Sequence, residues 1–68
     1  MADHVYKVVE VVGSSSESVA DAARNAVAKA AETLRHIEWF EVVSIRGHVV
    51  DGTVDRFQVT TKIGFRLD

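Results

Sequence analysis

The fold is decided by residues 51–67, DGTVDRFQVTTKIGFRL, where a turn signal leads into an alternating strand. Asp51 and Gly52 both tolerate the positive φ that a two-residue type I′ hairpin turn requires. After them, one face carries Phe57, Val59, Thr61, Ile63, Phe65 and Leu67, and the other carries Arg56, Gln58, Thr60, Lys62, Gly64 and Arg66. The alternation predicts a strand with one core face and one polar face, returning antiparallel to the segment before the turn.

Residues 39–50, before the turn, are predicted to form the partner strand. They are rich in aromatic and β-branched residues and show little helical spacing. If the loop has two residues and no residue is bulged, the side shared with Gln58 and Arg66 also carries Trp39, Val43 and Ile45. A single bulged residue would move part of this strand to the other face, so the register stays open.

An amphipathic helix is predicted upstream of these two strands. Ser14 and Glu17 have the spacing of a capping box and predict its start. A stripe of apolar residues follows at helical spacing: Val19, Ala22, Ala23, Ala26, Val27, Ala30, Ala31 and Leu34. The helical spacing stops after His36. Because alanine dominates the stripe, the helix axis can approach a sheet closely.

The valine-rich segment VYKVVEVV, within residues 4–12, is predicted to be a further strand. Alternation leaves both of its sides mostly apolar, which predicts that one side packs on the helix and the other meets another subunit. The expected architecture is therefore α+β: β-α-β-β, a three-stranded antiparallel sheet with one helix packed across it, in a single domain spanning residues 1–68.

Length and composition narrow the classes of protein that this chain can be. With 68 residues and no cysteine it has room for one domain and lacks disulfides, which favours association with copies of itself. The net charge of -2 is spread along the chain and argues against a nucleic-acid partner. The sequence has no apolar run of membrane-spanning length and no basic-then-apolar signal peptide, so we expect a cytoplasmic protein.

Four strand residues are candidates for ligand binding. Trp39 is either a core aromatic or a stacking platform for a flat heteroaromatic ligand. Gln58, Arg46 and Arg66 are assigned to one polar side; a glutamine amide suits the edge of a heterocycle, and arginine suits phosphate or carboxylate. Taken singly, each of the three is also typical of a solvated strand residue.

Catalytic and metal-binding patterns are weak. The three histidines lack the spacing of a metal pair, and no nucleophile has a credible base beside it, so we do not expect an enzyme. The serines after Gly13 are interpreted as helix caps rather than as a phosphate loop. In an oligomer, a single Asp or Glu can form a carboxylate ring on a symmetry axis and hold Ca²⁺ or Mg²⁺.

The chain resembles the dodecins, a family of small flavin-binding proteins. The resemblance is carried by VYKVVEVVG at residues 5–13, TLRHIEWFEV at 33–42, IRGHV at 45–49 and the closing FQVTTKIGFRLD. It implies a hollow homododecamer with the helices outside and the sheets enclosing the interior. It also implies that the protein stores FMN or riboflavin and quenches the photochemistry of the flavin.

The resemblance also implies a role for each candidate residue. Trp39 matches the tryptophan that stacks on paired flavins at subunit interfaces, and Gln58 matches the glutamine that hydrogen-bonds the pyrimidine edge. Arg46 and Arg66 match arginines associated with the flavin site. Some bacterial dodecins bind coenzyme A on the outer surface, for which the nearest residues here are Lys29, Thr33 and Arg35. The alternative function is an oligomeric shell that binds divalent cations without a flavin role.

Overall fold

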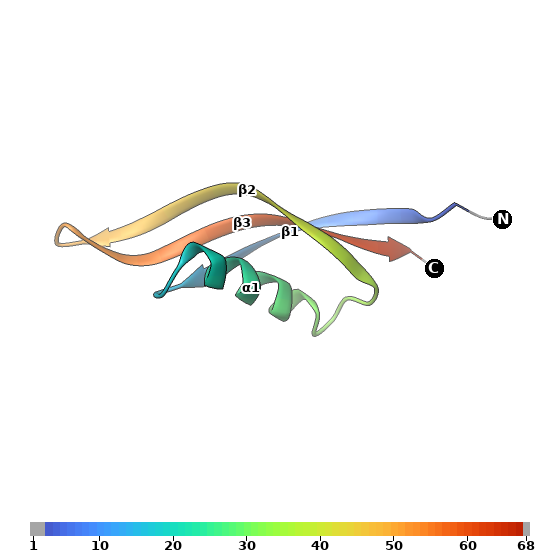
Figure 1. Ribbon diagram of the computed structural model, residues 1–68, viewed down its shortest axis with the longest axis horizontal. Helices are drawn as coiled ribbons and strands as arrows, with labels where there is room; N and C mark the ends of the chain where they lie inside the picture. The colour runs from blue at the N-terminus through green and yellow to red at the C-terminus, as the bar shows by residue number, and fades with distance from the viewer. Residues whose placement is uncertain (1–2, 68) are drawn as a thin grey trace.

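The protein is described by a computed structural model that covers residues 3–67, so the ends of the predicted domain, Met1, Ala2 and Asp68, lie outside the described residues. Four elements follow one another along the chain: β1 (Val5–Ser15), α1 (Val19–Ala30), β2 (Ile37–Val50) and β3 (Thr53–Leu67). The three strands form one antiparallel sheet in the order β1-β3-β2, and α1 lies across one face of it (Figure 1). The predicted β-α-β-β architecture is confirmed.

The hairpin between β2 and β3 forms where the sequence predicts it. Asp51 and Gly52 have φ values of 52° and 74°, the positive values that a type I′ turn requires. Farther along β3, the side chains of Val59, Thr61 and Ile63 are fully buried, which confirms this part of the predicted core face. Leu67, at its end, is 46% exposed.

The helix packs closely on β1 and β3, as its alanine stripe predicts. Ala22 and Ala26 are almost fully buried, and a Cβ atom built on Gly13 of β1 would collide with the carbonyl oxygen of Ala22. Only a glycine fits at this position in β1, because the backbone of the helix occupies the space of a side chain.

The predicted start of the helix is wrong. Ser14 does not cap it, because β1 continues to Ser15 and Ser14 pairs with Gln58 of β3. The N-cap is Ser18, whose hydroxyl oxygen accepts a hydrogen bond from the backbone N–H of Asp21 at 2.9 Å. The buried Ser15 hydroxyl accepts the Glu17 N–H at 2.9 Å and donates to the Asp21 carboxylate at 2.8 Å. Because of the strand pairing and these hydrogen bonds, the helix begins only at Val19.

The helix also ends earlier than its apolar stripe. Ala31 is the C-cap, so Leu34 lies in the following turn, where its N–H still donates to the Ala30 carbonyl at 2.9 Å. His36, with a φ of 62°, then turns the chain into β2. Arg35 and His36 therefore lie beyond the helix, and Lys29 is the basic residue in its last turn.

The chain is elongated for its length. Its extents are 57 × 20 × 14 Å and its radius of gyration is 14.2 Å, whereas a compact chain of this length has a radius of about 11 Å. The helix leaves β2 largely bare, so that Phe40, Val42 and Ile45 are 43–57% exposed. This much exposed apolar surface on a small chain is typical of a subunit that packs against others.

Candidate functional site

A β-bulge at Val43 decides which side chains of β2 lie together. Val42 pairs with Thr61 of β3, but Ser44 pairs with Thr60, so the register shifts by one residue between them. A second shift lies next to the hairpin, where Val49 pairs with Val54 but His48 pairs with Arg56. It makes the unbulged register wrong for Ile45, which pairs with Val59 on the side of the helix. The same shift brings Arg46 opposite Gln58, on the face of the sheet away from α1. Without the bulge at Val43, Arg46 and Trp39 would point to opposite faces.

We call the sheet face away from α1 the open face. The residues of the site that lie on this face, as the pairing of the three strands places them, are Tyr6, Val8, Trp39, Arg46, Gln58, Gly64 and Arg66. All four residues predicted to bind the ligand are therefore on one face of the sheet.

Trp39 lies over the middle strand at one end of the open face. It pairs with Gly64, and a Cβ atom on that glycine would collide with the benzenoid part of the indole. The ring of Tyr6 meets the indole edge to face, with centroids 5.1 Å apart and planes at 66°. Trp39 is 39% exposed, so it is supported by its own sheet but not enclosed by it.

Polar side chains surround the Tyr6 hydroxyl at the same end. The carboxylate of Glu38 acts on this hydroxyl and lies 3.7 Å from the Arg66 guanidinium. Desolvation raises the pKa of Tyr6 above its ordinary value of 10, the negative charge and hydrogen bond of Glu38 raise the pKa further, and Arg66 opposes the shift. A second nitrogen of Arg66 lies 3.5 Å from the Nδ1 atom of His36. Arg66 is thus held beside Trp39 by its neighbours in the fold.

Arg46 and Gln58 form a second group on the open face. The Nε–H of Arg46 donates a hydrogen bond of 2.8 Å to the Oε1 atom of Gln58. This bond orients the amide, because it engages the carbonyl oxygen and directs the two N–H donors of Gln58 away from Arg46. It also engages only one of the five N–H donors of the guanidinium.

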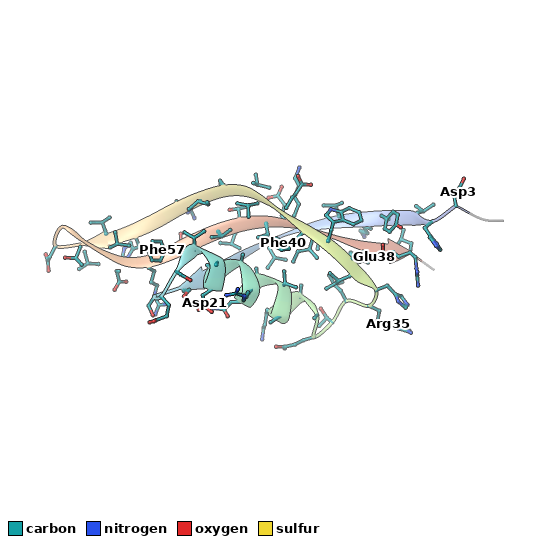
Figure 2. The ribbon with its side chains drawn as sticks, in the orientation of Figure 1. Asp3, Asp21, Arg35, Glu38, Phe40 and Phe57 are labelled. Atoms are coloured by element: carbon teal, nitrogen blue, oxygen red, sulfur yellow. The ribbon has the colours of Figure 1, made fainter. Side chains whose placement is uncertain are left out.

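The two groups do not meet within one chain. The β3 partners of Trp39 and Arg46 are Gly64 and Gln58, six residues apart, which corresponds to roughly 20 Å along a strand. In Figure 2, Glu38, next to Trp39 in the chain, lies toward one end of the sheet, and Phe57, next to Gln58, lies toward the hairpin. A single chain cannot hold one flat ring system against both its Trp39 and its Gln58.

The residues considered for coenzyme A lie elsewhere, around the end of α1. Lys29 is exposed and its ammonium lies 3.4 Å from the Glu32 carboxylate. The Thr33 N–H donates to the Ala30 carbonyl at 3.1 Å, and Arg35 is at the turn into β2 (Figure 2). Their exposure is compatible with a surface ligand, and their role stays a prediction.

Two features of residues 3–67 concern other functions. No group of three or more His, Asp or Glu side chains in this part of the chain could hold a metal ion. Over the same residues, α1 is neither long nor apolar enough to cross a membrane.

Sequence reasoning missed three residues of this site: Tyr6, Glu38 and Gly64. Gly64 carries a signal that could have been used, because a glycine inside an alternating strand often marks a close approach by another group. Tyr6 and Glu38 carry no such signal, since their proximity to Trp39 depends on the pairing of all three strands.

Fold and site together define a small α+β binding protein with an aromatic platform on its open face, and comparison with known proteins identifies the family. The dodecin family model matches residues 5–68. The dodecin of Thermus thermophilus is 48% identical over 64 residues, covering 94% of this chain and 93% of that protein.

Solved structures agree. The dodecin from Streptomyces davaonensis has a TM-score of 0.94 and 48% identity, with 98% of each chain covered. The dodecin from Streptomyces coelicolor has a TM-score of 0.94 and 51% identity, covering 100% of this chain and 97% of that one. The chain belongs to the dodecin family.

Proposed function

We propose that this protein stores and sequesters a flavin, FMN or riboflavin, at the subunit interfaces of a hollow homododecamer. Membership of a family known to bind flavins supports this function, and the observation that carries it is the exposure of Trp39. Its indole lies on the sheet with 39% of the residue exposed, on a face that no element within residues 3–67 covers. Such a ring is suited to stack on the isoalloxazine of a flavin.

The distance between the two groups supports a site shared by two copies. A flavin on Trp39 of one copy is out of reach of the Gln58 side chain of the same chain, roughly 20 Å away along β3. A second copy related by a two-fold axis brings its own Gln58 to that flavin, and the first copy does the same in return. Each site then needs both chains, which links ligand binding to assembly.

The orientation of Gln58 favours the pyrimidine edge of a flavin. Because Arg46 engages the amide oxygen, the amide presents two N–H donors, which match the carbonyl oxygens of that edge. The remaining donors of Arg46 suit ribityl or phosphate oxygens, which favours FMN over riboflavin. Arg66, beside Trp39, is the second arginine within reach of a flavin tail.

Quenching follows from stacking. An indole in contact with an excited flavin donates an electron to it and recovers the electron without net reaction, so the light energy is released as heat. This role needs no turnover, and we propose that the protein is not an enzyme. These residues suit a protein that stores and protects a pigment better than they suit a redox catalyst, because a redox catalyst needs an open path to a second substrate.

Flavin fluorescence tests the proposal. Titrating the protein into FMN and into riboflavin is expected to quench their emission, and Trp39→Ala should weaken binding by about 1–3 kcal/mol, roughly 5- to 150-fold. Phe40→Ala is the matched control, since it removes the neighbouring aromatic from the other face of β2. Native mass spectrometry should show the same assembly for all three proteins. Equal affinity in wild type and Trp39→Ala would contradict the proposal.

The other ligands that the sequence suggests are tested separately. Calorimetry with coenzyme A should lose its heat in a Lys29→Ala/Arg35→Ala variant if the end of α1 binds that molecule. Calorimetry with Ca²⁺ and Mg²⁺ tests the alternative of a cation-binding shell. Carboxylates gathered on a symmetry axis would give heat and a thermal shift without any dependence on Trp39.

A further inference from the structure

We infer that Gly64 and Tyr6 are positioning residues that fix the Trp39 indole in its ligand-binding orientation before any ligand arrives. The inference rests on the proposed function, because it takes the indole to be the stacking platform. Neither residue is expected to supply the stacking surface itself. Each acts through the tryptophan.

Gly64 lies directly under the indole, in contact with its benzenoid ring. It is buried, it faces Trp39 across the β2–β3 ladder, and the nearest atoms to its missing Cβ are Cε2, Cζ2 and Cη2 of the indole. Any side chain here would lift the benzenoid ring away from the sheet. A glycine weakens a strand, so its presence inside the central strand is explained by this close approach.

Tyr6 lies beside the indole and contacts it. Its ring meets the indole edge to face at 5.1 Å, which opposes rotation of the tryptophan about its side-chain bonds. The Glu38 carboxylate interacts with the Tyr6 hydroxyl, and the Arg66 guanidinium lies 3.7 Å from the same carboxylate. Gly64 on β3 and Tyr6 on β1 thus restrain the Trp39 ring of β2 from two directions.

Restraint of this kind raises affinity without adding a contact to the ligand. A half-exposed tryptophan on a flat surface samples several rotamers, and stacking would select one of them. Fixing the rotamer in advance removes that cost and improves the dissociation constant by about two- to tenfold. The restraint also fixes the distance and angle at which an electron passes between indole and flavin.

Gly64→Ala, Tyr6→Ala and Tyr6→Phe test the inference, with Gly47→Ala as the control. Gly47 is a second glycine of the same sheet, and a Cβ there meets its nearest atom, the Arg56 carbonyl oxygen, at 3.4 Å, an ordinary contact. The chain has one tryptophan, so its near-ultraviolet circular dichroism and its fluorescence anisotropy report on this indole alone. Both are measured in the ligand-free protein, and flavin titration follows.

Gly64→Ala should reduce the anisotropy and the dichroic band of Trp39 and weaken FMN binding at least about tenfold. Tyr6→Ala should weaken binding about tenfold, and Tyr6→Phe, which keeps the ring and loses the hydroxyl, about two- to threefold. Gly47→Ala should match wild type in every measurement. If Gly64→Ala fails to assemble, the two Tyr6 variants carry the test.

The outcomes separate this inference from the proposed function. If wild type and the Gly64 and Tyr6 variants bind FMN equally well, or if the indole is equally ordered in all of them, the inference is overturned while flavin binding stands. If wild type does not bind FMN or riboflavin, the proposed function fails, and the optical signals of the ligand-free proteins still show whether Gly64 and Tyr6 order the ring.

Discussion

The two faces of the sheet differ in how far their side chains are buried. The face under α1 is closed by small residues packed to contact, with Val59, Ile63 and Ala22 fully buried. The open face, on the same strands, leaves Trp39 and Tyr6 each 39% exposed. The first face is completed within the chain over β1 and β3, although its β2 side chains stay exposed, and the second face is suited to completion from outside. Substitutions on the two faces should therefore affect different quantities: folding stability on one, ligand affinity on the other.

The largest effect is expected under the helix. Gly13→Val places a branched side chain where the Ala22 carbonyl lies, and a backbone group cannot move aside cheaply. The variant should lose about 3 kcal/mol or more of folding stability in chemical denaturation. Gly47→Ala, on β2, should lose less than about 1 kcal/mol. A Gly13→Val protein of normal stability would show that the helix does not need this close approach.

On the open face, Gln58→Leu should weaken flavin binding by about 1–3 kcal/mol and leave the denaturation midpoint unchanged. The loss reflects hydrogen-bonding groups of the ligand left without partners. Gln58→Glu sharpens the test, because it preserves the contact with Arg46 but removes the two amide donors. It should bind as poorly as Gln58→Leu, and wild-type affinity in Gln58→Glu would show that the glutamine does not donate to the flavin.

The helix start offers a smaller effect on the covered side. Ser18→Ala removes the hydroxyl that accepts the Asp21 N–H and should cost about 1 kcal/mol of folding stability. Ser14→Ala is the comparison, since Ser14 lies in β1 and should cost less than about 0.5 kcal/mol. Thermal or urea denaturation measures both losses of stability. A larger loss in Ser14→Ala than in Ser18→Ala would show that Ser14 is the cap.

The smallest effect is confined to alkaline pH, on the open face. Tyr6 is the one tyrosine of the chain, so absorbance of tyrosinate gives its titration directly. Its pKa should lie above 10, and Glu38→Gln should move the pKa back toward 10 because it removes the adjacent negative charge. Since the folded-state pKa is raised, the stabilisation from neutral Tyr6 is complete below pH about 10 and is lost as the pH rises through the folded-state pKa. An unshifted midpoint in wild type would show that Tyr6 and Glu38 do not interact.

The sequence predicts the elements well where one pattern dominates. The alternation of residues 57–67 and the Asp51-Gly52 turn fix β3 and the hairpin, because each pattern admits one structure. The helix start was mispredicted because four nearby serines can each cap a helix, and only pairing of β1 with β3 shows which one does. The helix end was mispredicted because Leu34 continues the apolar stripe after the backbone has left the helix.

The site was predictable as residue types but not as an arrangement. Trp39, Arg46 and Gln58 are visible in the sequence, yet the two register shifts that bring them to one face, at Val43 and next to the hairpin, are not. Val42, Val43 and Ile45 are all apolar, so no change of polarity marks the residue at which β2 shifts its register. The separation of roughly 20 Å between the tryptophan and the glutamine likewise follows from the pairing and not from their spacing in the chain.

The strand order β1-β3-β2 has a consequence for how the protein is made. β3 is the central strand, and it follows both of its neighbours in the chain, so a nascent polypeptide on the ribosome has no sheet until β3 has emerged. The contact between Val5 and Leu67 must close a loop of nearly the whole chain. Formation of the sheet therefore depends on its last strand, and a chain that stops before β3 has two edge strands and no centre.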